Sequence, residues 1–398
     1  MTSRLILKTR LLCAMILPFL SCLFLFGCWD NREINALAII VGAAIDKQDN
    51  KIKLSVQVFV PRTAGGGQQS AGGSGGSEPK VLVRSGIGDN LADAVANLQQ
   101  KVPRDIFWGH CDIFIFGEKL AKDGKLMQQQ FDYLNRHPQP RERAKLFLSQ
   151  GQAFKVLELQ PPLEKDIGDV LKKLSNLEIT QEITMKDFEQ MAVNESQATI
   201  MPVISILPSK KKETIPFLTG VAIFREFKMI GIIKGDAARG LWFVLNKVEE
   251  PTITGKNKKG GIISAKILKQ KTKLSPLIHN GDWTMSIDVT SDAMLTQNGA
   301  MADIMKPRIS RQLEKYVEED IKTSIKMAMA QVKNNMHADV FGFGEKFHQE
   351  YPRQWHRLED NWNDFLPNVS VKINANIHLR EPGLMTIPNE LIQKGRTE

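Results

Sequence analysis

The first 26 residues of the chain restrict most strongly where and how the remainder can fold. Three basic residues, Arg4, Lys8 and Arg10, precede a run of 16 residues from Leu11 to Phe26 that is almost entirely apolar. A charged start followed by a short apolar run is typical of a signal peptide. As an α-helix this run extends only about 24 Å, less than the roughly 30 Å hydrocarbon core of a bilayer. We therefore predict an export signal, residues 1–27, rather than a permanent membrane span.

The end of the apolar run indicates the type of signal. The order Leu25-Phe26-Gly27-Cys28 resembles the lipobox of bacterial lipoproteins, although Phe26 occupies a position usually held by a small residue. We expect cleavage after Gly27, a diacylglycerol thioether on the Cys28 sulfur and an acyl group on the new amine of that cysteine. One acyl chain holds a protein on a membrane only marginally, whereas two anchor it stably. The alternative is a buried Cys28 within an uncleaved anchor helix.

Cysteine content and charge limit the remaining possibilities. Of four cysteines, only Cys111 stays a free thiol after the predicted processing, so an internal disulfide and a CxxC zinc site are excluded. Removal of the three basic residues of the signal lowers the formal charge from +9 to +6. Lysine clusters such as Lys210–Lys212 are one signature of nucleic-acid binding. In an exported protein, anionic phospholipid, acidic partners or plain solvated faces are favoured, and we predict no nucleic-acid partner.

The N-terminal half alternates strands and helices. Two strands are predicted within residues 36–60, a helix over residues 89–102 with Asp89 or Asn90 as N-cap, and a strand over residues 108–116. Thr184 and Asp187 have the spacing of a capping box. Seven glycines lie between Gly65 and Gly76, where no core can form. These patterns predict an N-terminal α+β domain, residues 28–205, with a flexible glycine-rich insertion at 64–78.

The C-terminal half is predicted to contain two further domains. Prolines and lysines at residues 202–212 indicate a boundary, followed by a small hairpin-plus-helix domain, residues 213–275. Turn-forming residues at 275–282 indicate a second boundary, before a C-terminal domain of residues 282–385. In that domain, alternating strands at 283–295 and 368–379 are predicted to share an antiparallel sheet covered by a long helix at about 304–337. The predicted fold class is therefore α+β, with three mixed domains.

Residue patterns for catalysis and metal binding are missing from the sequence. The seven histidines form no HExxH motif, and His348 and His356 would lie about 12 Å apart on a helix, too far to share a metal. His110 and Cys111 are adjacent on a predicted strand, so their side chains point to opposite faces and cannot act as base and nucleophile. No nucleophile elbow or Walker loop occurs. The sequence thus predicts a non-enzymatic protein with no cofactor, no metal site and no catalytic residue.

An aromatic stretch near the C-terminus allows two interpretations. Gly342 and Gly344 are expected to break the long helix, since each glycine costs a helix about 1 kcal/mol. Aromatic and leucine side chains then recur every three or four residues from Phe347 to Phe365. They form either a stripe facing the core or a docking face for another protein. The spacing alone does not distinguish the two, because aromatic residues serve both purposes.

Four stretches together resemble one known family. They are "CWDNREINALAIIVGAAIDK" (28–47), "WGHCDIFIFGEKLAKDG" (108–124), "LTGVAIFREFKMIGIIKGDAARGL" (218–241) and the region 339–379 beginning "DVFGFGEKFHQEYPRQWHRLEDNW". In this order they are similar to the Ger(x)C family, the lipoprotein C subunits of spore germinant receptors. The resemblance extends from the lipobox to about Gly383, and it includes the glycine-rich insertion.

The resemblance implies a non-enzymatic subunit anchored by lipid to the outer surface of the spore inner membrane. The expected partners are a receptor A subunit and a transporter-like B subunit, in an assembly that senses small nutrients and starts germination. Only the lipidation site at Cys28 carries over residue by residue. Whether this subunit contacts the germinant is left open. The alternative function is a nutrient-binding lipoprotein serving a transporter, which usually has two α/β lobes around a deep cleft.

Overall fold

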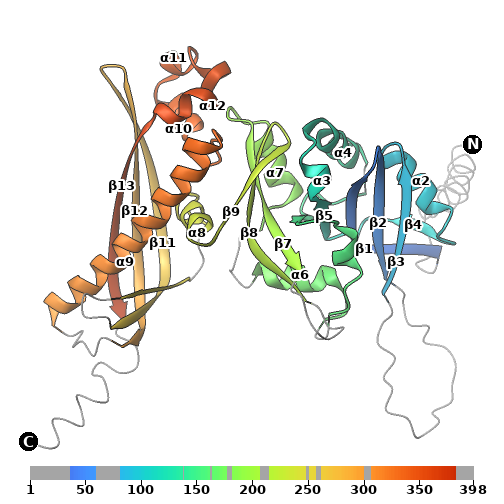
Figure 1. The fold of residues 1–398 in the computed structure, drawn as a ribbon, viewed down its shortest axis with the longest axis horizontal. Coiled ribbons are helices and arrows are strands. Elements are labelled where there is room, and N and C mark those ends of the chain that lie inside the picture. The colour runs from blue at the N-terminus through green and yellow to red at the C-terminus, as the bar shows by residue number, and fades with distance from the viewer. Residues whose placement is uncertain are drawn as a thin grey trace, which may run out of the picture.

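The computed structural model describes residues 36–59, 81–137, 139–161, 164–176, 182–206, 215–247, 251–256, 261–299 and 306–381. Within these residues the strands form two sheets, one of nine strands and one of four. Figure 1 shows the sheets side by side along the longest axis of the molecule. The signal segment, Cys28 and the glycine-rich insertion at 64–78 lie outside the described residues. The α+β fold class is confirmed.

The first sheet has a parallel centre and antiparallel flanks. Its strands are β1 (Leu37–Gln48), β2 (Lys51–Phe59), β3 (Val81–Gly88), β4 (Asp105–Phe107), β5 (Ile113–Gly117), β6 (Lys145–Ser149), β7 (Ala198–Ile206), β8 (Pro216–Arg225) and β9 (Lys228–Lys234). They lie in the order β3-β2-β1-β5-β6-β7-β8-β9, with the short β4 also pairing with β1. Strands β1, β5, β6 and β7 run parallel, while β2, β3, β8 and β9 pair antiparallel with their neighbours.

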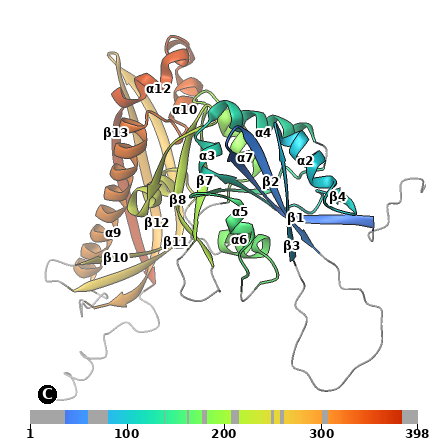
Figure 2. The same ribbon diagram turned by 45° about the vertical axis from the view of Figure 1, so that its right-hand side comes forward.

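Helices cover both faces of this sheet. They are α2 (Leu91–Gln99), α3 (Glu118–Ala121), α4 (Gly124–Arg136), α5 (Phe154–Leu157), α6 (Ile167–Asn176) and α7 (Met185–Ala192). Phe131 of α4 and Phe188 of α7 stack at 4.5 Å between ring centroids, in a cluster that also includes Phe116 of β5. Leu157 of α5 and Ile167 of α6 belong to a second cluster on the other face. Figure 2 shows these two layers on either side of the sheet.

The helix caps of this half form as the sequence predicts, whereas one predicted strand begins later than expected. The Asn90 side chain accepts a hydrogen bond from Asp93 N and caps α2, and Thr184 and Asp187 form both bonds of the capping box of α7. The strand predicted at 108–116 begins only at Ile113. Residues before it form a turn, in which Cys111 N donates to Trp108 O at 2.9 Å.

The second sheet is covered by one long helix. Its elements are β10 (Thr252–Lys256), β11 (Ile262–His279), β12 (Asp282–Asn298), α9 (Pro307–Ala328), a π-helix (Met329–Asn335) and β13 (Ser370–Glu381). The strand order is β10-β11-β12-β13, with β12 and β13 parallel and the other pairs antiparallel. Ile321 and Ile325 of α9 are fully buried, as is Ile287 of β12, and Figure 2 shows α9 running along one face. The predicted shared sheet and covering helix are thus confirmed, and the predicted antiparallel pairing holds for every pair except β12 and β13.

Helix α8 (Gly235–Val244) joins the two sheets. A Cβ atom added at Gly240 would lie 2.0 Å from Ser324 O of α9, so a glycine is required where the two helices cross. At this crossing Arg239 donates to Asp320 at 2.7 Å and to the Ser324 hydroxyl at 3.0 Å. The C-terminal end of α8 reaches the edge of β11, where two side chains of that strand donate to Phe243 O. Both sheets are therefore packed on this one helix.

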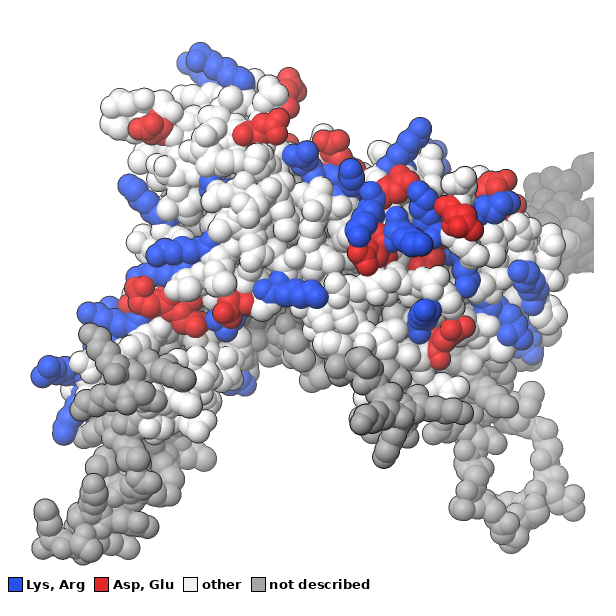
Figure 3. Space-filling view, viewed as in Figure 1, with Lys and Arg blue, Asp and Glu red and all other residues white. Residues whose placement is uncertain are grey.

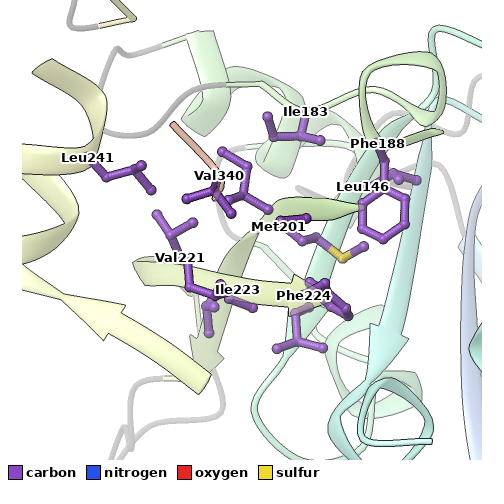
Figure 4. Packing of buried hydrophobic residues seen from close by; sticks show 14 of the residues in the cluster. Leu146, Ile183, Phe188, Met201, Val221, Ile223, Phe224, Leu241 and Val340 are labelled. Atoms are coloured by element: carbon purple, nitrogen blue, oxygen red, sulfur yellow. The ribbon is translucent and has the colours of Figure 1, made fainter. Parts of the chain in front are cut away.

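The boundary predicted at residues 202–212 does not separate two cores. Strands β7 and β8 on either side of it pair antiparallel in one sheet, with Ile204 opposite Leu218. Figure 4 shows Met201, Val221 and Phe224 in the same packed cluster as Leu241 of α8. The prediction of separate cores is wrong here, because prolines and a lysine run also occur in the loop that connects two paired strands.

The boundary predicted at residues 275–282 is also wrong as a division between sheets. Asn280 and Gly281, at φ of 51° and 89°, form the two-residue turn between β11 and β12. An Asn-Gly pair with both residues left-handed is the preferred connection of a tight β-hairpin. The turn formers therefore join β11 and β12 in a single hairpin. Strand β11, assigned by the prediction to the middle domain, belongs to the C-terminal sheet.

Candidate functional site

A small helical unit, which we call the aromatic cap (residues 339–368), closes the second sheet on the side of the first. It contains α10 (Phe343–Glu350), α11 (Pro352–Trp355), α12 (Trp362–Phe365) and two 3₁₀ turns, Glu359–Asn361 and Leu366–Asn368. Figure 1 shows the cap at the top of the molecule, beside the turn between β8 and β9. The cap belongs to the second sheet and also contacts the first sheet, and this contact region between the two is called the junction.

Asp339 organises the aromatic cap from within. This fully buried carboxylate accepts hydrogen bonds from Phe343 N at 3.0 Å, Gly344 N at 2.6 Å and Trp362 Nε1 at 2.8 Å. Burial raises the pKa of the Asp339 carboxyl, and these N–H donors oppose the rise by favouring the charged form. One side chain therefore fixes the start of α10 and the position of α12.

The two glycines of the cap have separate structural roles. Gly342 has a φ of 77°, a left-handed conformation that ends the preceding segment before α10. A Cβ atom at Gly344 would lie 2.7 Å from the Trp355 ring and 2.9 Å from Trp362 Nε1. A break after the long helix is present, but that helix already ends at Asn335, before both glycines, so the glycines do not cause it. Gly342 instead precedes α10, and Gly344 within α10 allows two indole rings to approach the backbone.

The aromatic stripe forms a core rather than an exposed face. Phe347 and Trp355 are fully buried and Trp362 is 1 % exposed. Trp283 of β12 packs against Phe347 with ring centroids 4.6 Å apart, and Trp355 packs against Trp362 at 4.9 Å. Of the two interpretations of this stretch, the core-facing one is supported for these residues. They attach the cap to the second sheet.

The cap docks onto the loop between α7 and β7 of the first sheet. The Ser196 hydroxyl donates to Asp339 O at 2.9 Å, and Asn363 Nδ2 donates to Ser196 O at 2.8 Å. Val340 of the cap lies in the same hydrophobic cluster as Met201 and Val221, as Figure 4 shows. Residues 143 positions apart in the sequence therefore meet at a buried junction.

A polar cleft of about 610 Å³ opens at this junction. Its walls are residues 193–195 and Gln197 of the α7–β7 loop, Arg225 at the end of β8 with the turn residue Glu226, and His348, Trp355 and residues 359–364 of the cap. Five of the lining side chains are carboxylates, against one guanidinium; the acids are Glu195, Glu226, Glu359, Asp360 and Asp364. In Figure 3 acidic side chains are visible on this upper part of the molecule.

Two of these carboxylates are paired with histidines. Glu195 lies 3.0 Å from His348 Nδ1 across the junction, and Glu359 lies 2.9 Å from His356 Nδ1 within the cap. The hydrogen bond from His348 holds the pKa of Glu195 below its ordinary range. Asp360 and Asp364 are exposed and form no ion pair with another described residue. The cleft therefore presents negative charge to solvent.

The thiol singled out in the sequence lies elsewhere and is inert. Cys111 is fully buried just before β5, where its sulfur donates to Ile113 O at 3.3 Å, and burial raises the pKa of the thiol. A raised pKa lowers the thiolate fraction, which is the reactive form. His110 is exposed and Asp112 pairs with Lys172 at 3.2 Å. The triplet forms no catalytic arrangement.

Metal ligands and membrane-spanning helices are both missing from the part of the chain that the structure describes. Within it, no three histidine, cysteine or acidic side chains are grouped so as to hold a metal ion. None of its helices is long and apolar enough to cross a membrane. Cys28 and the Gly27 cleavage position lie outside the described residues, and their roles stay predictions.

The sequence did not reveal the acidic cleft. Its residues come from three segments that are far apart in the chain, and they approach each other only in the folded structure. One signal was available, the acid-rich stretch "EDNWND" at 359–364, which supplies three of the five carboxylates. Such a stretch is also common on ordinary solvated surfaces, so it did not identify a site by itself.

Comparison with known proteins assigns both halves of the chain to spore germination families. The model described as the spore germination protein N-terminal domain matches residues 30–206, and the spore germination B3/GerAC-like C-terminal model matches residues 219–383. The first match ends at the last residue of β7, and the second match begins within β8, so the loop between these strands lies between the two matches. The sequence families therefore divide at this loop, although the first sheet continues across it.

Individual relatives match over nearly their whole length. Spore germination protein KC of Bacillus subtilis (strain 168) is 26% identical over 397 residues, covering 94% of this chain and 96% of that protein. Spore germination protein B3 of the same organism is 23% identical over 368 residues, covering 91% and 95%. The crystal structure of the GerBC protein has a TM-score of 0.57 at 19% identity, covering 85% of this chain and 97% of that chain, and it shows a shared fold.

Proposed function

Because this chain belongs to the Ger(x)C family of spore germination proteins, we propose that it is the lipid-anchored, non-enzymatic C subunit of a nutrient germinant receptor. The observation that carries the proposal is the match of both family models, in order, from residue 30 to residue 383. In this proposal it acts by assembly or signal relay with the A and B membrane subunits. Spore germination proteins A3, B3 and KC are among its relatives.

The proposed anchor is Cys28, after cleavage behind Gly27, on the outer surface of the spore inner membrane. Strand β1 begins at Leu37, nine residues after this cysteine. A fully extended chain of nine residues spans about 30 Å, so the anchor would hold the first sheet close to the phospholipid surface. Two or more acyl chains would make this attachment stable without a membrane-spanning helix.

Two structural features support a binding role over a catalytic one. The buried Cys111 is a core residue, and the cleft at the junction is lined by carboxylates and amides with no serine or cysteine nucleophile among its lining residues. General base catalysis on a nucleophile requires the two groups within hydrogen-bond reach. Instead of a catalytic arrangement, the chain presents surface from two different sheets, to which partner proteins can bind.

The alternative, a nutrient-binding lipoprotein for a transporter, receives less support. Such binders enclose their ligand between two similar lobes. Here one sheet is mixed with nine strands and covered on both faces, while the other has four strands and one covering helix. The cleft at the junction lies between unlike units. We therefore place the function in assembly or relay.

The anchor is tested by replacing Cys28 with alanine in the full chain expressed in sporulating cells. The wild-type chain should incorporate labelled fatty acid, lose residues 1–27 and fractionate with the inner membrane. Cys28→Ala should retain its signal and incorporate no label. Cys111→Ala is the matched control, since it removes the other thiol and should leave lipidation unchanged. Label on the Cys28→Ala chain would reject the anchor.

The receptor role is tested separately by affinity purification of the tagged full chain from detergent-solubilised spore inner membranes. Co-purification of the A and B subunits at constant ratio is the expected outcome. A lipidated, correctly localised chain that purifies without either subunit would reject the receptor role while leaving the anchor intact. A germination assay with single nutrients then tests whether loss of the chain abolishes the response.

A further inference from the structure

Strand β13 forms one outer edge of the second sheet. It stands last in the strand order and pairs with β12 on one side. Figure 1 shows it at the left of the molecule, with α9 crossing beside its C-terminal end. A strand at the edge of a sheet presents a row of N–H and C=O groups that find no partner in their own sheet. Whether the rest of the protein covers this row decides whether the edge can bind another chain.

Carboxylates of α9 cover the C-terminal half of this edge. Ile377 N donates to Glu318 Oε1 at 3.4 Å. Two residues further on, Leu379 N donates to Glu314 Oε1 at 3.1 Å. Arg311 pairs with both carboxylates and holds them beside the strand. The protein thus closes this half of the edge with its own side chains, and the two N–H groups must point away from β12.

The N-terminal half of the same edge carries equivalent groups without such a cover. The register of β12 and β13 is unbroken up to Leu379, and alternate residues of a strand turn their backbone groups to the same side. Val371, Ile373 and Ala375 therefore direct theirs away from β12, as the covered residues do. No group of the described chain bonds to these three N–H and three C=O groups. They form an open edge of six backbone groups.

The edge of the first sheet is treated differently. At β3, Asn97 Nδ2 donates to Ile87 O at 2.8 Å and Lys101 Nζ donates to Ser85 O at 3.0 Å. Natural proteins blunt their edge strands by such devices, because an open edge invites pairing with another chain. Residues 371–375 contain no proline, and within the described part of the chain no side chain donates to their outward carbonyls. This stretch is therefore left able to pair.

The side chains of the open edge specify the sequence pattern of its occupant. Val371, Ile373 and Ala375 pack against the hydrophobic core but are only partly buried, so an added strand would place apolar side chains beside them. On the outer face Lys372 is exposed and forms no ion pair with a described carboxylate. A carboxylate at the neighbouring position of an added strand would be a favourable cross-strand partner for this lysine.

We propose that residues 371–375 bind an extended segment of a partner protein as a fifth strand of the second sheet. The segment alternates apolar residues, which continue the core row, with acidic residues, which face Lys372. Backbone hydrogen bonds provide affinity in this mode of recognition, and alternate side chains provide specificity. A second copy of the chain is disfavoured, because it brings a second Lys372 and no carboxylate to the same face. The inference rests on the proposed function only for the identity of the partner as another receptor subunit.

Hydrogen exchange at single amides of the purified full chain in detergent tests whether the edge is open. The amides of Val371, Ile373 and Ala375 should exchange rapidly, because they lack a hydrogen bond, and those of Ile377 and Leu379 more slowly. Slow exchange of the first three at every protein concentration would mean that the chain itself covers them. Slow exchange that appears only at high concentration would assign the edge to a second copy. Either result would overturn the inference.

Binding is tested with a fluorescently labelled seven-residue peptide of alternating valine and glutamate. Its anisotropy should rise to saturation as the full chain is added, and the three edge amides should become protected. Ala375→Pro removes an outward N–H and leaves the pairing with β12 intact, since proline is tolerated where the N–H of an edge strand faces away from the sheet. Binding should then weaken at least about tenfold. Ala375→Ser keeps the N–H and is the matched control, with unchanged affinity.

A reversal of charge tests the side-chain pattern. Lys372→Glu should weaken binding of the valine–glutamate peptide about fivefold and should allow a valine–lysine peptide to bind. Lys269→Glu makes the same change of charge on the same outer face, but on β11 and away from the edge, so it should leave the affinity unchanged. Thermal unfolding of every variant is measured alongside. If Ala375→Pro does not fold, Lys372→Glu decides the result.

Two results of the binding experiment would overturn the inference. One is the absence of saturable binding of the valine–glutamate peptide to the wild-type chain. The other is equal weakening by Lys372→Glu and Lys269→Glu, which would assign the binding to general charge. Neither result depends on co-purification of receptor subunits, so the proposed function is judged by its own experiment.

Discussion

The two sheets differ in how many of their faces are buried. In the first sheet, all five residues of β5 and all five of β6 are buried, since helices cover both faces. In the second sheet, β12 alternates between buried and partly exposed residues along almost its whole length. The sequences differ in the same way, with "IFIFG" and "KLFLS" in the first and "WTMSIDVT" in the second.

The difference in buried faces follows from how the strands of each sheet are connected. Parallel strands need crossover connections, usually helical, that lie on the faces of the sheet, so a parallel centre becomes covered on both sides. The β11–β12 hairpin needs only the two-residue turn at Asn280 and Gly281 and brings no covering helix. One face of the second sheet is therefore left to solvent, and its outward positions carry polar residues such as Thr290.

The largest effects are expected where neighbouring residues of β5 face opposite layers. Phe114 belongs to one hydrophobic cluster and Ile115 to the other, and both are fully buried. Phe114→Ala should lower the free energy of unfolding by about 4 kcal/mol and Ile115→Ala by about 3 kcal/mol, because each leaves a cavity. Urea unfolding followed by tryptophan fluorescence measures both. Ile87→Ala, at a 38 % exposed position of the same sheet, should change stability by less than about 0.5 kcal/mol.

The next largest effect is expected at the carboxylate that organises the aromatic cap. In Asp339→Asn an amide nitrogen would face the Gly344 N–H and the Trp362 Nε1–H, both of which now donate to Asp339 Oδ2. Loss of two charge-assisted hydrogen bonds should cost about 3 kcal/mol. Thermal unfolding should show the loss, with Asp364→Asn at an exposed cap position as the unaffected control. A stable Asp339→Asn cap would show that the carboxylate is dispensable.

A smaller contrast is expected within β12. Val289 points into the core and is 2 % exposed, whereas Thr290, its neighbour, points to solvent. Val289→Ala should cost about 2 kcal/mol through lost burial and a small cavity, and Thr290→Ala less than about 0.5 kcal/mol. The same urea experiment compares the pair. Equal losses would mean that both faces of the second sheet are covered, and the comparison between the sheets would fail.

The smallest effect is expected from the pair that bridges the junction. The hydrogen bond from His348 lowers the pKa of Glu195 in the folded state. Its contribution is therefore present above the unfolded value of about 4.3 and is lost as the pH falls through the lower folded value. Because both side chains are about one third exposed, the contribution should stay below about 1 kcal/mol.

Glu195→Gln isolates this contribution. At pH 7 the variant should be slightly less stable than the wild type, and near pH 3 the two should converge, as measured by urea unfolding at each pH. Asp49 forms no ion pair with another described residue, so the free energy of unfolding of Asp49→Asn should follow that of the wild type at every pH. A constant difference between Glu195→Gln and the wild type from pH 7 to pH 3 would contradict the assignment.

Much of the fold could be predicted because short-range physics decides it. The Asn90 cap and the Thr184–Asp187 capping box depend on groups three residues apart, and both form as predicted. The shared sheet of β12 and β13 followed from matching alternation, and in the structure Ile287 lies opposite Ile373. Both predicted domain boundaries failed as breaks between cores, because a turn signal marks a change of direction and carries no information about which sheet the next strand joins.

The sequence by itself determined the pattern of an export and lipidation signal, the family, the caps and the alternation of β12. Each depends on residues that are close together in the chain. Only the tertiary structure decided that the core continues across residues 202–212, that Asp339 binds the backbone of the aromatic cap, and that Glu195, Glu226 and Asp364 share one cleft. The core continues across residues 202–212 because the consecutive strands β7 and β8 pair within the first sheet. The cleft joins segments far apart in the chain, which meet only once the two sheets have packed together.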